Sequence, residues 1–295
     1  MAYGNDQLEV FEDGELPDDV YARVLIFGPS GAGKTTLAST APGPRLVIAS
    51  DHNCEVPLRV TLAQLPRIYT PEGEQSRKPT VYLRPRDSDQ LLEAISRTGE
   101  YINTHGIRTV IFDSITSVSE MLMQEILEIR NDSLARSGRG RRSVLERLDK
   151  NGYGILNQRL SNIRNMLHKL PVHVVWTAGF REPYMRAEDG SDRRGGPDIP
   201  GQQSRYFPSQ TLASLYVEQS LQHGERHVQV RTCVFNDIDA KDNTGRLQPI
   251  EPPDLYVLFA RMGYLTPGVA AAVEKAVPRM SKDAMHAALE GVAFG

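Results

Sequence analysis

The segment GPSGAGKT, residues Gly28–Thr35, is the most specific indication of the fold in this chain. It lies between an apolar run, YARVLIF (Tyr21–Phe27), and a short helical pattern that ends near Thr40. This is the strand–loop–helix context that the phosphate-binding motif G-x-x-x-x-G-K-[ST] requires. Glycines let backbone N–H groups curl around a phosphate, Lys34 reaches the β- and γ-phosphates, and Thr35 places its hydroxyl on Mg²⁺. The motif predicts a site for ATP and Mg²⁺ formed by Gly28, Pro29, Ser30, Gly31, Ala32, Gly33, Lys34, Thr35 and Thr36.

Short apolar runs and helical patterns alternate on the C-terminal side of this loop. We expect buried strands at 46–49, 109–112 and 172–177, further strands at 212–218 and 227–235, and helices at 117–129 and 155–170. Strands that alternate with helices predict an α/β fold with a mainly parallel, doubly wound sheet, as in P-loop NTPases.

One further helix is expected to begin near Ser88 and to end at Gly106. Its inward side should carry Leu91, Leu92, Ile95 and Ile102. The tail from Asp254 also has a helical pattern, with Thr266-Pro267 at the start of one helix and Ser281 as the N-cap of another.

Length and composition bound the class of protein. A chain of 295 residues with 40% apolar and 24% charged residues is expected to form one large globular domain, which excludes disordered and fibrous classes. No apolar run approaches the roughly 18 residues that cross a bilayer, and the N-terminus lacks a signal-peptide pattern. We therefore expect a cytoplasmic protein with no membrane partner. Cys54 and Cys233 are too few for a disulfide framework or a common zinc site and are expected to be buried thiols.

The chain divides into three predicted parts. Residues 1–20 carry seven acids and no Lys or Arg, a composition that self-repels and predicts a flexible or partner-docked arm. Residues 21–250 form the predicted core, and 251–295 form a small helical C-terminal extension.

Two acids are expected to act on the nucleotide. Asp113 follows the apolar run 110–112, at the end of a neighbouring strand, and should hold Mg²⁺. Many P-loop machines place a water-activating Glu directly after that Asp, but here the next residue is Ser114. Asp51 follows the second strand, which a sheet of this kind should place beside the first. We predict that Asp51 orients and deprotonates the attacking water, with Glu55 as the fallback and a merely solvated Asp51 as the other interpretation.

The order of several segments resembles the RecA recombinase core. These segments are GPSGAGKTT (28–36), LVIASDH (46–52), VIFDS (110–114), GYGILNQRLSNIRNMLHKL (152–170), VHVVWTAGFR (172–181) and PGQQSRYFPSQTLASLYVE (200–218). The resemblance covers about 21–250 and is most specific at the phosphate-binding loop. Because the core lacks the family's additional DNA-binding domains, it is most similar to the minimal RecA-like ATPases encoded by bacteriophages, some of which act in single-strand annealing and recombination.

This resemblance implies a DNA-stimulated ATPase that works as a ring or filament on single-stranded DNA in the host bacterial cytoplasm. A single-strand DNA-binding protein is a further expected partner. The family's catalytic Glu corresponds to Asp51, and its γ-phosphate-sensing Gln corresponds to Gly179. Lysines near 241 reach the neighbouring subunit's ATP in this family, which implies an intersubunit role for Lys241 or Arg246. An ordinary turn at these residues is about equally expected.

The first candidate DNA-binding segment is 130–147. It holds six arginines against two acids, a local balance of 6 − 2 = +4 in a chain of net charge −3. Such a segment suits contacts to phosphates, and by resemblance it takes the place of the family's first DNA-binding loop. A solvated loop is the alternative. The candidate residues are Arg136, Arg139, Arg141 and Arg142.

The second candidate DNA-binding segment is 181–205. It has five arginines and five acids, so its charge alone predicts nothing. Its place in the chain and its glycines favour DNA contact, as do the neighbouring Tyr206 and Phe207, which could stack on bases, although such aromatics more often belong to a core. The candidate residues are Arg193, Arg194 and Arg205.

The leading function is an ATP-dependent, single-strand DNA-binding recombination or annealing protein that acts as a multimer. The alternatives are a small-molecule P-loop kinase, for which 130–147 would be an arginine-bearing lid, a nucleotide-gated clamp with negligible turnover, and a helicase or packaging motor on the same core. ATP consumption that rises with single-stranded DNA rather than with a nucleoside separates the first function from a kinase.

Overall fold

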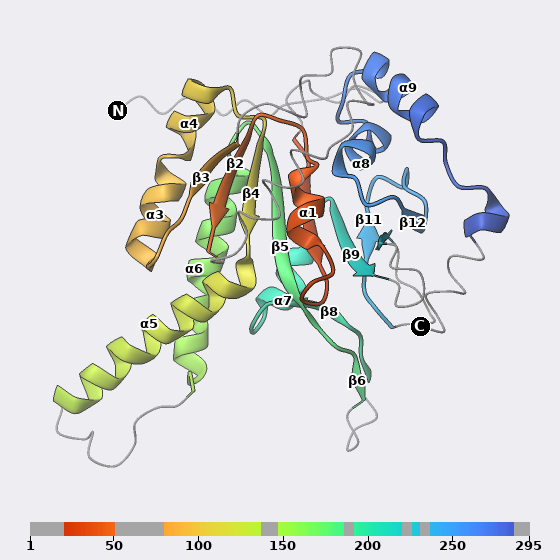
Figure 1. Cartoon of the computed structure of the whole chain (residues 1–295). Coiled ribbons are helices and arrows are strands. Elements are labelled where there is room, and N and C mark those ends of the chain that lie inside the picture. The colour runs from red at the N-terminus through yellow and green to blue at the C-terminus, as the bar shows by residue number, and fades with distance from the viewer. Residues whose placement is uncertain are drawn as a thin grey trace, which may run out of the picture.

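The computed structural model describes residues 21–50, 80–136, 147–185, 192–219, 226–230 and 237–285. A central sheet carries helices on both faces (Figure 1). The strands are β1 (Arg23–Phe27), β2 (Arg45–Ala49), β3 (Thr80–Leu83), β4 (Thr109–Asp113), β5 (His173–Arg181), β6 (Tyr184–Met185), β7 (Asp192–Arg193), β8 (Gly196–Asp198), β9 (Ala213–Gln219), β10 (Arg226–Gln229), β11 (Lys241–Asp242) and β12 (Ile250–Glu251). The helices are α1 (Lys34–Ser39), α3 (Ser88–Ser96), α4 (Thr98–His105), α5 (Ile115–Arg136), α6 (Lys150–His168), α7 (Gln203–Ser209), α8 (Leu255–Met262) and α9 (Pro267–Ala276).

The main sheet has the strand order β12-β10-β9-β1-β5-β4-β2-β3, and β11 pairs with β9. The run from β9 to β3 is parallel throughout, whereas β10, β11 and β12 are added antiparallel at one edge. Parallel strands are buried on both faces, which accounts for continuous apolar runs such as VLIF, residues 24–27 of β1. The predicted α/β fold with a mainly parallel, doubly wound sheet is confirmed.

The prediction that the second strand lies beside the first is wrong. The neighbours of β1 are β5 and β9, and both β5 and β4 stand between β1 and β2. The chain leaves β1 through α1, forms β2 in an outer position, and then returns inward through β4 and β5. Strands that are consecutive in the sequence are therefore not neighbours at the phosphate-binding loop.

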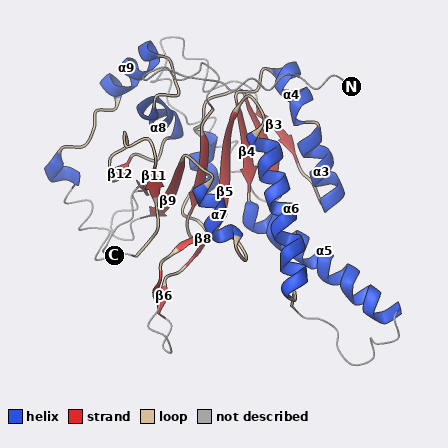
Figure 2. Cartoon of the chain, turned by 180° about the vertical axis from the view of Figure 1, so that it is seen from behind, coloured by secondary structure: helices blue, strands red, loops and turns tan. Residues whose placement is uncertain are grey.

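Side chains alternate between the two faces of the sheet. In β1, Leu25 and Phe27 belong to the apolar cluster that includes residues of α3, α5, α6 and α7, whereas Val24 and Ile26 belong to the cluster that includes residues of α1 and α8. Figures 1 and 2 show these two helix layers from opposite sides. The two apolar clusters hold the C-terminal ends of the central strands at one edge of the sheet, where the loops of the candidate site emerge.

Several helix boundaries differ from the prediction. The helix expected from Ser88 to Gly106 is divided at Arg97 into α3 and α4, and Leu92, which was expected to face inward, is 49% exposed. The buried residues of α3 are Leu91 and Ile95, one helical turn apart. Gly106 ends α4 in the left-handed conformation, as its predicted C-cap role requires.

The predicted helical tail is present as α8 and α9. Every residue of α8 is buried, and its Arg261 forms an ion pair with the equally buried Glu251 of β12. Thr266-Pro267 begins α9, and the backbone N–H of Ala284 donates to the Ser281 hydroxyl at 3.2 Å. The acidic arm 1–20, Cys54 and Cys233 lie outside the described residues. Among the described helices, none combines the length and the apolar character needed to cross a membrane.

Two partly buried histidines, His168 at the end of α6 and His173 at the start of β5, are held in the neutral form. His173 Nδ1 accepts the backbone N–H of Ala22 at 3.0 Å, and His168 Nε2 accepts the indole N–H of Trp176 at 3.1 Å. Burial, and then the charge of Arg23, lower the pKa of each imidazole from 6.5 to about 4. Protonation of the accepting nitrogen would break each of these hydrogen bonds.

This geometry predicts an acid-sensitive fold. Because each folded-state pKa lies below the unfolded value, the stabilisation is complete above about pH 6.5 and is lost as the pH falls toward 4. The loss is complete only below about pH 4, so about 2 kcal/mol per histidine should be lost between pH 7 and pH 5. Urea unfolding at pH 7 and pH 5 measures it. His173→Gln should reduce the pH dependence, whereas the control His105→Gln, at an exposed position on α4, should leave it unchanged. An equal free energy of unfolding at both pH values would contradict the prediction.

Candidate functional site

The phosphate-binding loop joins the end of β1 to the start of α1. Gly31 and Gly33 have φ angles of 79° and 97°, in the left-handed region that side chains other than glycine rarely adopt. Gly28 meets a different constraint, because a Cβ there would lie 2.3 Å from the carbonyl oxygen of Val217 in β9. Two glycines thus allow the loop to turn, and the third allows it to pass close to the neighbouring strand.

The Lys34 ammonium lies over this loop. Its Nζ donates to the carbonyl oxygens of Gly28 at 3.0 Å and Pro29 at 2.8 Å. These bonds keep a positive charge beside the loop N–H groups, where the motif binds the β- and γ-phosphates of a nucleotide.

The Asp113 carboxylate, at the end of β4, is only 4% exposed. Its Oδ2 accepts a hydrogen bond from the Thr35 hydroxyl at 2.7 Å, and its Oδ1 accepts one from the hydroxyl of Thr177 in β5. Both carboxylate oxygens are therefore oriented by threonines from other elements. Sequence reasoning missed Thr177, whose only signal is a hydroxyl side chain near the end of a buried strand.

Asp51 and Glu55, the predicted bases, lie outside the described residues. The preceding residue, Ser50, shows where the chain leaves β2. Its N–H donates to the carbonyl oxygen of Asp113 at 2.8 Å, and its hydroxyl donates to the carbonyl oxygen of Ser114 at 3.0 Å. The pairing of β2 with β4 produces this contact. The chain thus leaves β2 beside Asp113, and not beside β1 as expected.

The loop, Thr35 and Asp113 line one cavity of about 490 Å³, which we call the nucleotide cavity. Its lining includes two charged residues that the sequence analysis did not single out, Glu120 of α5 and Arg226 of β10. Glu120 follows Asp113 by about two helical turns, which is a weak sequence signal. Arg226 is far from the loop in the sequence, so only the pairing of β10 with β9 brings it to the cavity.

Gly179 of β5 also lines this cavity. Its N–H donates to the Thr116 hydroxyl at 2.8 Å, and that hydroxyl donates to the carbonyl oxygen of Asp198 in β8 at 2.7 Å. A Cβ at Gly179 would lie 3.4 Å from the same hydroxyl. Thr116 therefore supplies a polar group at the place where the resemblance implies a Gln.

The nucleotide cavity fits a magnesium nucleotide. Mg²⁺ prefers oxygen ligands, and the Thr35 hydroxyl and the Asp113 carboxylate are adjacent. A volume of about 490 Å³ is within the range of small-molecule sites, and a Cβ at Gly31 would meet no atom within 4 Å, so the loop is open to a ligand. Thr35 and Asp113 would hold the metal ion, and the loop with Lys34 would hold the phosphates.

The predicted arginine-rich loop 130–147 begins as a helix, because α5 continues to Arg136. Arg130 is thus helical and forms an ion pair with Asp149, the N-cap of α6. Arg136 is exposed at the end of α5, which projects from the body of the molecule (Figure 1). Arg139, Arg141 and Arg142 lie outside the described residues.

A second cavity, of about 690 Å³, lies beside the end of β5, and we call it the arginine cavity. Its cationic lining residues are Arg181, Arg194, Arg205 and Lys241. Asp239 also lines it and pairs with Arg194 at 3.3 Å. Burial lowers the pKa of the Lys241 ammonium. This cavity therefore brings together Arg194 and Arg205, which were predicted to bind DNA, and Lys241, which was predicted to contact a neighbouring subunit.

The remaining predicted residues are placed elsewhere. Arg193 belongs to β7, and the Arg246 guanidinium donates to the carbonyl oxygen of Met262 at 3.3 Å, at the end of α8. Phe207 is fully buried, with its ring centroid 4.9 Å from that of Trp176, so the idea that it stacks on bases is wrong. Tyr206 is 53% exposed.

The contact between Thr177 and Asp113 predicts a specific defect. Thr177→Val keeps the size of the side chain but removes the hydroxyl that orients Oδ1, so the Mg²⁺ concentration needed for half-maximal nucleotide binding should rise about 10-fold. A Mg²⁺ titration of nucleotide affinity measures this shift. Thr109→Val is the control, because it removes a buried hydroxyl at the opposite end of β4. An unchanged Mg²⁺ requirement in Thr177→Val would show that Thr35 and the metal orient Asp113 without it.

Comparison with known proteins agrees with this geometry. No curated protein shows significant similarity to the chain. A family model described as "AAA domain" matches residues 21–243. The match includes the phosphate-binding loop, Asp113 and the strands from β1 to β11, which is most of the chain. The chain therefore belongs to the AAA domain family and has the core of a P-loop NTPase.

Proposed function

We propose that this protein is an ATP-dependent, single-stranded-DNA-binding protein of recombination or strand annealing. It hydrolyses ATP in the nucleotide cavity, works as a multimer in a ring or filament, and is encoded by a bacteriophage. DNA stimulates the hydrolysis, and a single-strand DNA-binding protein is an additional partner.

One observation carries this proposal: the end of β5 borders both cavities. Gly179 lines the nucleotide cavity, and Arg181, two residues further on, lines the arginine cavity. β8 pairs with this end of β5, and its Gly196 and Pro197 belong to the second lining. The two cavities thus share one strand, through which we propose that a change at the nucleotide reaches the arginines.

The charges of the arginine cavity support a phosphate ligand. Among the described residues of its lining there are four cations, Arg181, Arg194, Arg205 and Lys241, and one acid, Asp239. Guanidinium groups bind phosphate oxygens through paired N–H donors. The chain as a whole has a net charge of −3, so such attraction must be local. In a multimer, Lys241 is also proposed to approach the neighbouring subunit's phosphates.

Hydrolysis needs a group that orients and deprotonates water. We retain Asp51 for this role, because Ser50 contacts the Asp113 segment directly, and Glu55 remains the fallback. Among the described residues, Glu120 also lines the nucleotide cavity and is a further candidate.

Three variants separate the candidate bases. Asp51→Asn should keep ATP binding but lose about 10²–10⁴-fold in turnover, the usual effect of removing a general base. Glu55→Gln and Glu120→Gln should retain most of the turnover. Steady-state hydrolysis and equilibrium ATP binding measure the two properties separately.

Lys34→Ala is the reference variant for this series. It should lose hydrolysis and bind nucleotide weakly, because it removes the charge beside the β- and γ-phosphates. Loss of binding by Asp51→Asn would indicate a structural Asp51. A selective loss of turnover in Glu55→Gln or Glu120→Gln would assign the base to that residue instead.

DNA binding should depend strongly on salt. If about four arginines contact a single strand, the logarithm of affinity should fall with the logarithm of salt concentration at a slope near −0.7 × 4, roughly −3. Replacement of Arg139, Arg141 and Arg142 with Ala should make the slope shallower by about two units and weaken binding to all sequences almost equally. Fluorescence anisotropy of labelled oligonucleotides over a salt series measures the slope.

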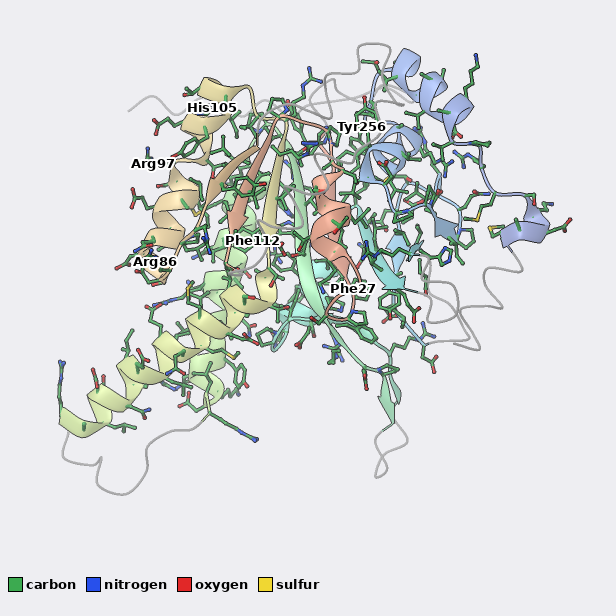
Figure 3. All side chains as sticks on the ribbon, viewed as in Figure 1. Phe27, Arg86, Arg97, His105, Phe112 and Tyr256 are labelled. Carbon is green, nitrogen blue, oxygen red and sulfur yellow. The ribbon has the colours of Figure 1, made fainter. Side chains whose placement is uncertain are left out.

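A double variant outside both candidate DNA-binding segments is the control. Arg86 lies just before α3 and Arg97 just after it (Figure 3), and their replacement with Ala should leave the slope unchanged. Normal DNA affinity in the triple variant would assign the DNA contacts to the arginine cavity. The double variant Arg194→Ala/Arg205→Ala then tests that cavity. Loss of DNA-independent turnover in the triple variant would instead favour a kinase lid.

A further inference from the structure

Arg226 contributes a cation to the nucleotide cavity that lies outside the phosphate-binding motif. It is the first residue of β10, and its side chain extends to the loop: a Cβ built on Gly33 would lie 2.9 Å from Arg226 Nε and 3.1 Å from its Cζ. The guanidinium therefore lies directly against the residue that precedes Lys34.

The sheet holds Arg226 in this position. β10 pairs antiparallel with β9, with Arg226 opposite Gln219, and β9 pairs parallel with β1, with Tyr216 opposite Phe27. The first residue of β10 thus lies at the same edge of the sheet as the loop that follows Phe27. Within the part of the chain that the structure describes, no hydrogen bond or ion pair engages the Arg226 guanidinium.

The strand order indicates which part of a nucleotide Arg226 faces. Thr35 and Asp113, which would hold Mg²⁺ at the β- and γ-phosphates, lie toward β5 and β4 on one side of β1. Arg226 approaches from β9 and β10 on the other side of β1. The backbone N–H groups of such a loop hold the α- and β-phosphates, and Gly33 is part of that loop.

We propose that Arg226 is a nucleotide-binding residue that contacts the α- and β-phosphates in its own subunit. The inference rests on the nucleotide binding proposed above, but not on DNA binding. Its planar guanidinium can donate two N–H groups to phosphate oxygens, which a point charge cannot do equally well. Because ATP and ADP share these two phosphates, Arg226 should contribute equally to the binding of both.

Isothermal titration without DNA tests the proposal. The ligands are ADP and a non-hydrolysable ATP analogue, each with Mg²⁺. Arg226→Ala should weaken both by a similar factor of about 10 to 100, as expected for loss of a charge-assisted hydrogen bond. Arg226→Lys should give an intermediate loss. Thermal unfolding of the nucleotide-free variants should match the wild type, since the Arg226 side chain is exposed and the strand pairing is retained.

Arg86→Ala is the matched control, because it removes an exposed arginine at the β3 edge of the sheet, at the other end of the strand order from β10 (Figure 3). It should bind both nucleotides normally. Normal affinity of Arg226→Ala for both ligands would overturn the proposal. A loss confined to the ATP analogue would also overturn it, because Arg226 would then contact only the γ-phosphate. If wild-type hydrolysis proves independent of DNA while Arg226→Ala loses affinity for both ligands, only the proposed DNA function fails.

Discussion

The hydrogen bonds around the Asp113 carboxylate are the constraint on which the site depends. Thr35 donates from the start of α1, and Thr177 donates from β5, so one buried side chain connects three elements. A carboxylate in such a position needs partners for both oxygens, because an unsatisfied buried charge is costly. The requirement fixes the position of the phosphate-binding loop relative to the end of β4, where a metal ion would bind.

Close packing explains why the loop itself tolerates so little change. Gly28 passes so near to Val217 of β9 that any side chain would collide with the backbone, and Gly33 lies under the Arg226 guanidinium. The loop is therefore enclosed by β9 and β10 on one side, with β5 and β4 on the other. This enclosure also brings Gly179 to the nucleotide cavity and Arg181 to the arginine cavity at the end of a single strand.

Local patterns predicted the elements better than their ends or their packing. α5 extends to Arg136, beyond the predicted end of that helix, because helix formation continues through polar residues that no apolar periodicity marks. Leu92 is exposed although its neighbours Leu91 and Ile95 are buried. Phe207 belongs to the core beside Trp176, whereas the adjacent Tyr206 is open to solvent, and composition does not distinguish two neighbouring aromatics in this way.

The α/β class, the phosphate-binding loop and the acid at the end of β4 could be predicted without the structure. Each depends on local order: an apolar run, a glycine-rich turn, and a charged residue where a buried strand ends. The folded structure was needed to establish that β5 and β4 stand between β1 and β2, that Thr177 orients Asp113, and that Arg226 reaches the loop. It also decided that Arg181, Arg194, Arg205 and Lys241 share one cavity. The physical reason is the same in each case: these contacts join residues far apart in the chain, and their energies depend on packing between strands and helices that no single segment encodes.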